Sequence, residues 1–73
     1  MEMNEEQARE VQRRHEDRLL ALPSVTGVGV KLRSGRLVLA VDVDPDAEVP
    51  PELSQAEIDG LPLVVEKRRY EPQ

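Results

Sequence analysis

VTGVGVKLRSGRLVLAVDV, residues 25–43, is the stretch that decides the fold of this chain. On both sides of Ser34-Gly35, branched aliphatic residues alternate with small or polar ones, which is typical of strands with one buried face. A two-residue turn at Ser34-Gly35 pairs Arg33 with Arg36. The register that follows places these aliphatic residues on one face: Val28, Val30, Leu32, Leu37, Leu39, Val41 and Val43. Because a slip by one residue would mix the two faces, the pattern and the turn together predict a β-hairpin.

A one-sided amphipathic helix is predicted before the hairpin, over residues 5–22. Asn4 followed by Gln7 fits a capping box, and Pro23 marks the far boundary. The apolar stripe of this helix follows helical spacing and consists of Ala8, Val11, His15, Leu19 and Leu22.

Prolines break the chain after the hairpin, at Pro45, Pro50 and Pro51. A short helical turn is predicted at about residues 51–58, with Ser54 and Glu57 as a capping box, and Asp59-Gly60 ends it. A third strand follows, and its alternate residues are predicted to face the core: Leu61, Leu63 and Val65.

These elements predict an α+β fold with two layers in the order αββ(α)β, a three-stranded sheet with its helices on one face. Residues 1–73 form a single small domain, with residues 1–4 and 70–73 as flexible ends. We expect the third strand to lie beside the first, because a crossover with a short helix allows it. A place beside the second strand is the alternative.

Composition narrows the class of protein. The chain of 73 residues has no cysteine, which excludes a disulfide scaffold and thiolate metal sites. No window approaches the roughly 18 apolar residues of a membrane span, and the acidic start lacks a signal-peptide pattern. We therefore expect a cytoplasmic protein with no membrane partner. The formal net charge of -5 makes a nucleic-acid partner unlikely on the sequence alone.

Charge is unevenly distributed along the chain. Residues 42–59 carry acidic side chains and no basic one, whereas Lys31, Arg33 and Arg36 cluster around the predicted turn. This basic turn is a candidate anion site, although solubilising charge at a hairpin tip is the commoner use of such residues. Residues 67–69 form a second basic group that can compensate the acidic stretch.

No catalytic or metal-binding set is predicted. His15 is the only histidine and lies on the apolar stripe of the helix, without a nucleophile or further ligands in the pattern. The segment from Asp42 to Asp46 begins like a calcium loop, but Ala47 and Leu53 stand where such a loop needs glycine and glutamate. We expect no enzyme activity, no cofactor and no metal.

A candidate interaction face is predicted on the side of the sheet opposite the helix. Glycine inside a strand weakens it unless another backbone or a ligand approaches closely, and two glycines share this side. The predicted face consists of Gly27, Gly29, Val38, Ala40 and Val64. It would suit a sheet-to-sheet contact with a protein partner or in a homodimer, and the alternative is an ordinary solvated face with small residues.

Two longer motifs resemble those of a known module. RHEDRLLALPSVTGVGV (residues 14–30) and IDGLPLVV (residues 58–65), with Val49-Pro50 between them, are similar to a small bacterial αββαβ module. Its members carry L-P-x-V-x-G-V-G-V and I-D-G-x-P-V motifs and often precede a trypsin-like peptidase domain. The resemblance covers about residues 14–66. Its topology is similar to that of the α-lytic protease pro-region and of type II KH domains.

The resemblance implies two alternatives to an interaction module of unknown function. One is a pro-region-like folding or regulatory partner of a separate peptidase, and the other is a small KH-like RNA-binding domain. Lys31 stands where the module usually has another glycine, and no protease triad can be carried over to these 73 residues. The KH comparison lacks the Gly-x-x-Gly loop that clamps a nucleic-acid backbone.

Overall fold

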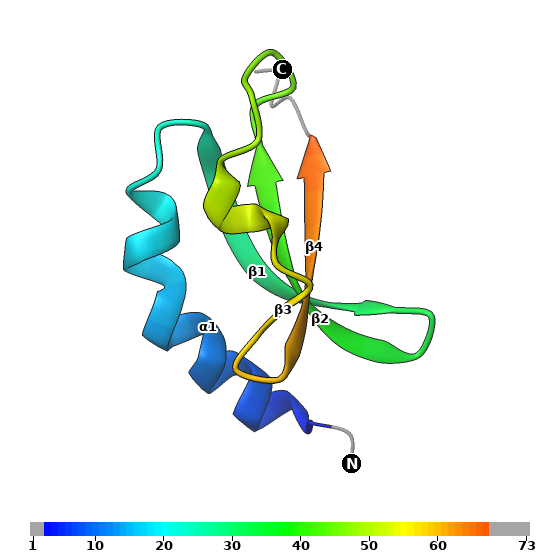
Figure 1. Cartoon of the computed structure of the whole chain (residues 1–73). Helices are drawn as coiled ribbons and strands as arrows, with labels where there is room; N and C mark the ends of the chain where they lie inside the picture. Colours follow the sequence, from blue (N-terminus) through cyan, green and yellow to red (C-terminus); the bar gives the residue numbers. More distant parts are fainter. Residues whose placement is uncertain (1–2, 68–73) are drawn as a thin grey trace, which may run out of the picture.

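The computed structural model describes residues 3–67 and has one α-helix beside a mixed sheet (Figure 1). Its elements are α1 (Glu5–Leu20), β1 (Val25–Arg33), β2 (Arg36–Val43), the 3-10 turn η1 (Pro51–Ser54), β3 (Glu57–Ile58) and β4 (Leu61–Lys67). The strand order is β1-β2-β4-β3, with β2 and β4 parallel and the other pairs antiparallel. The predicted α+β class is confirmed, with four strands where three were predicted. The end predicted at residues 70–73 lies outside the described residues.

Helix α1 begins at the predicted capping box. The Asn4 side chain accepts a hydrogen bond from the backbone N–H of Gln7 at 2.8 Å, and the Gln7 side chain accepts one from the Asn4 N–H at 3.1 Å. Asn4, placed in a flexible end by the sequence, therefore caps the helix. The helix ends at Leu20, two residues before the predicted end. The residue before a proline disfavours the helical conformation, so the chain leaves the helix ahead of Pro23.

The hairpin of β1 and β2 has the predicted register. Arg33 pairs with Arg36, and each further pair follows from it as far as Gly27 and Asp42. One extra residue, Thr26, forms a bulge at the start of β1. The predicted inner face is confirmed except at Leu32, which is 67% exposed because the hairpin turn projects away from α1 (Figure 1).

The expected place of the third strand beside the first was wrong. Strand β4 lies beside β2 instead, with Leu39 level with Leu63 and Val41 level with Val65. The physical reason is that β2 is apolar on both faces, since Val38 and Ala40 are buried as well as Leu39. A strand of this kind is stabilised most by a neighbour on each side, whereas β1, with its two glycines, is left at the edge.

The predicted helical turn at residues 51–58 was wrong in extent. Only η1 is helical, and the Ser54 hydroxyl donates to the Pro51 carbonyl at 2.7 Å instead of capping a longer helix. Strands β3 and β4 then form a small hairpin around Asp59 and Gly60, both with positive φ. Asp-Gly is a preferred pair for a two-residue hairpin turn.

One core joins the helix, the sheet and the connection between β2 and β4. Its buried residues are Ala8, Val11, Leu19, Val25, Leu39, Val41, Val43, Leu53, Ile58 and Leu61. Because α1 and η1 both contribute to this core, they lie on the same side of the sheet (Figure 1). Within residues 3–67, no helix or strand packs on the opposite side, which we call the outer face.

Candidate functional site

The structure brings the five residues of the predicted interaction face onto the outer face. Gly29 of β1 pairs with Ala40 of β2, and Ala40 pairs with Val64 of β4, so these three form a row across the sheet. Gly27 and Val38 share the same side of their strands by the alternation of a pleated strand. The five residues therefore lie on the same side of three neighbouring strands.

Charged side chains cross this face. Lys31 Nζ donates to the Glu66 carboxylate at 3.0 Å, and Arg33 donates to the other carboxylate oxygen. Lys31 is level with Val38 and Glu66 is level with Asp42, so the Lys31–Glu66 contact crosses β2 near Ala40. The outer face thus carries a charged contact beside Ala40, where the sequence predicted small residues suited to a sheet-to-sheet contact.

Burial differs strongly along the outer face. Val38 and Ala40 are only 5% and 2% exposed, although neither belongs to the helix-side core. Gly27, Gly29 and Val64 are partly exposed. A Cβ added at Gly29 would meet no atom within 4 Å, so the space above this residue is open. The accessible part of the candidate face is therefore centred on the edge strand β1.

Glu66 of β4 forms ion pairs with Lys31 and Arg33 of β1, on the far side of β2. The hydrogen bond from Lys31 is the main cause that holds the pKa of Glu66 below its usual range, and Arg33 acts in the same direction against partial desolvation. Two of the three residues of the basic turn thus share one carboxylate of β4. This sharing reduces the positive charge that the turn presents to an anion.

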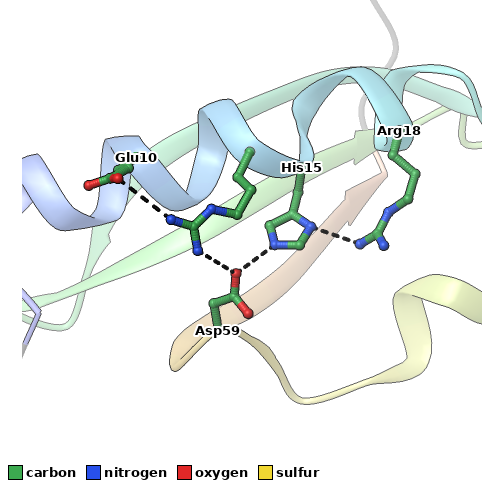
Figure 2. Close-up of polar contacts among 5 residues, drawn as sticks. Glu10, His15, Arg18 and Asp59 are labelled. Carbon is green, nitrogen blue, oxygen red and sulfur yellow. Dashed lines mark hydrogen bonds and ion pairs between the residues drawn. The ribbon is translucent and has the colours of Figure 1, made fainter.

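A second polar cluster joins α1 to the turn between β3 and β4 (Figure 2). His15 Nε2 lies 2.7 Å from the Asp59 carboxylate, and Arg18 lies 2.9 Å from His15 Nδ1. Arg14 reaches Asp59 and also Glu10, each at 3.5 Å. The cluster fixes the small β3–β4 hairpin against the helix.

The tautomer of His15 follows from its two partners. A guanidinium only donates hydrogen bonds, so Nδ1 must accept from Arg18 and Nε2–H must donate to Asp59. The hydrogen bond from His15 is the main cause that lowers the pKa of Asp59 below its usual range, and Arg14 adds to it. In a catalytic triad the second ring nitrogen faces a nucleophile, whereas here it faces a cation.

The sequence placed His15 at the edge of the core but missed its partner. Asp59 lies 44 residues further along the chain, and no local spacing connects the two. The available signal was a polar residue inside an apolar helix stripe, since a partly buried imidazole normally finds a hydrogen-bond partner.

The aspartates that resemble a calcium loop have separate structural roles. The Asp44 carboxylate accepts a hydrogen bond from the Asp46 N–H at 2.9 Å and so forms a tight turn, while Asp42 is buried on the outer face. No group of three or more His, Cys, Asp or Glu side chains is placed to hold a metal ion within the part of the chain that the structure describes.

Among residues 3–67, no helix has the length and apolarity that crossing a membrane requires.

Comparison of the chain with protein-family models, with curated proteins and with solved structures found no match. The resemblance to the peptidase-associated module therefore stays a prediction.

Proposed function

We propose that this chain is a non-catalytic interaction module that docks through its outer sheet face, with a second copy of the chain as its partner. The observation that carries the proposal is the one-sided covering of the sheet. Among residues 3–67, helix α1 and the β2–β4 connection cover one side, and the other side presents the partly exposed Gly29 and Val64 on either side of the buried Ala40.

The chemistry of this row suits a second sheet. Glycine has no Cβ, so another backbone can approach β1 closely at Gly29. The neighbouring Lys31, Arg33 and Glu66 carry both signs of charge, and the contact of Lys31 with Glu66 crosses the face beside Ala40. Protein–protein contacts usually combine small apolar areas with charged groups of this kind.

The absence of catalysis is part of the same proposal. His15 is the residue best suited to acid–base chemistry, and both of its ring nitrogens are occupied by Arg18 and Asp59. A general base needs a free nitrogen within reach of the proton that it removes. This arrangement supports a structural role for His15.

The test is the solution mass against concentration, with Gly29→Glu as the blocking variant and Gly29→Ala as its control. An added Cβ at Gly29 meets no atom within 4 Å, so neither variant creates a close contact at this atom in the monomer. We expect the mass of the wild type to rise above one chain at high micromolar concentration, and Gly29→Ala to need a higher concentration, because its Cβ keeps the partner's backbone further away. Gly29→Glu should remain at one chain, since a carboxylate would be buried in the contact.

A wild-type mass equal to one chain throughout this range would contradict docking between copies. Equal association of Gly29→Glu and the wild type would place the contact elsewhere on the molecule. Circular dichroism of both variants verifies that the fold is retained.

A further inference from the structure

The free edge of β1 is a second surface with its own chemistry. Arg33 and Arg36 close the hairpin, so the odd-numbered residues of β1 exchange hydrogen bonds with β2. The backbone N–H and C=O groups of Val28, Val30 and Leu32 therefore point away from the sheet. Gln12 supports this direction, because its side-chain amide donates to the Val28 carbonyl at 3.3 Å.

Part of this edge is open for pairing. Within residues 3–67, the backbone groups of Val30 and Leu32 that point away from β2 have no hydrogen-bond partner. Leu32 also exposes its side chain to 67%, next to the partly buried Val30. An open edge with exposed apolar side chains is a template for an added strand.

Basic side chains flank the edge on both sides of the sheet. On the helix side, a groove of about 390 Å³ is lined by Arg9, Gln12, Arg13 and Val30. Arg13 has no carboxylate within ion-pair distance among residues 3–67. On the outer face, the side chains of Lys31 and Arg33 remain 34% and 49% exposed. Arg9 is paired with Glu5, and Lys31 and Arg33 share Glu66, so the positive charge beside the edge comes from Arg13 and from the two cations that share one carboxylate. The edge therefore keeps a local excess of positive charge in a chain whose net charge is -5.

We infer that the free edge of β1 binds an extended acidic segment of a partner protein, which adds to the sheet as a further strand. Alternate side chains of the added strand face opposite sides. Apolar side chains would pack on Val30 and Leu32, and carboxylates would lie beside Lys31 and Arg33. The β1 edge of a second copy is a poor occupant, because it would bring like charges together. The inference uses the backbone edge of β1, shares only Lys31 and Arg33 with the proposed docking face, and does not depend on that docking.

The probe is the fluorescent peptide acetyl-Glu-Val-Glu-Val-Glu-Val-amide, and its matched control has lysine in place of every glutamate. Fluorescence anisotropy measures binding to the whole chain. We expect the acidic peptide to bind at least about tenfold more tightly than the basic one, because opposite charges meet along the edge.

Val30→Pro separates backbone pairing from simple charge attraction. The Val30 N–H points outward, so proline removes one donor of the edge and leaves the β1–β2 ladder in place. We expect on the order of tenfold weaker binding of the acidic peptide by Val30→Pro. Val30→Ala keeps the donor and serves as the control. Val30→Pro should also leave the mass-against-concentration curve unchanged.

A peptide with N-methyl groups on alternate residues tests the same contact on the wild-type protein, in case Val30→Pro does not fold. Removal of these peptide donors should weaken binding by about tenfold as well. Equal binding of the acidic and basic peptides would overturn the inference, as would equal binding of the methylated and unmethylated peptides. If a scrambled acidic peptide bound as tightly as the probe at low salt, the binding would come from charge attraction alone, and the inference would be overturned.

Discussion

The backbone of Ser34 and Gly35 is the residue-scale feature that sets the hairpin register. Both residues have positive φ, 51° and 78°, as a two-residue hairpin turn of type I′ requires. Serine adopts this conformation at a cost, whereas asparagine tolerates it. We therefore expect Ser34→Asn to raise the free energy of unfolding by about 0.5–1 kcal/mol, measured by urea denaturation.

Gly35→Ala is the matched control for this prediction. A Cβ at Gly35 would meet no atom within 4 Å, so only the backbone conformation opposes it. The expected loss is about 1 kcal/mol in the same denaturation experiment. If Gly35→Ala unfolded at the same urea concentration as the wild type, the turn would not have positive φ in solution.

At the scale of elements, β2 is the strand on which the core depends. Leu39 is fully buried between β1 and β4, while Leu32 lies on the same face but is exposed. Leu39→Ala should lower the free energy of unfolding by about 2–5 kcal/mol, because it removes apolar contacts and leaves a cavity. Leu32→Ala should change it by less than about 0.5 kcal/mol. Similar losses for both variants would contradict the placement of the core.

The elements that could be predicted from the sequence are those set by local pattern. The capping box of Asn4 and the turn at Ser34-Gly35 both depend on neighbours in the chain, and both are confirmed. The place of β4 depends on pairing across residues 44–60, which no local spacing encodes. The apolar residues on both faces of β2 were the missed signal, together with Asp59-Gly60 between Ile58 and Leu61.

For the candidate site too, the sequence predicted what local pattern determines and missed a long-range contact. Strand alternation assigned Gly29, Ala40 and Val64 to one face, because period two follows directly from the hairpin register. The contact of Lys31 with Glu66 was not predictable, since it needs the order of the strands. The predicted face of small residues therefore also carries a long-range ion pair.

For the molecule as a whole, two carboxylates connect distant parts of a thin two-layer structure. Asp59 holds the β3–β4 turn to α1, and Glu66 holds β4 to β1. The pKa of each is lowered in the folded chain. A lowered folded-state pKa adds stability that is complete above the usual value near 4 and is lost as the pH falls through the folded value.

Unfolding at acidic pH tests whether the Asp59 carboxylate contributes this stability. Between pH 5 and pH 3, Asp59→Asn should lose less stability than the wild type, because its side chain no longer takes up a proton. Asparagine also tolerates the positive φ of Asp59, which is 50°, so the backbone is not an added variable. Urea denaturation at each pH is the measurement. Asp17→Asn, an exposed change on the helix, should follow the wild-type curve, and an identical curve for Asp59→Asn would contradict the prediction.

The position of β4 has a consequence for how the chain folds during synthesis. A growing chain emerges from its N-terminus, so α1, β1 and β2 leave the ribosome before Leu61–Lys67. Until then, the central strand has a neighbour on one side only, and Leu39, Val41 and Val43 lack part of their cover. Until Leu61–Lys67 has emerged, the nascent chain therefore exposes an unpaired edge and apolar side chains of β2, and the native sheet forms only after β4 has joined it.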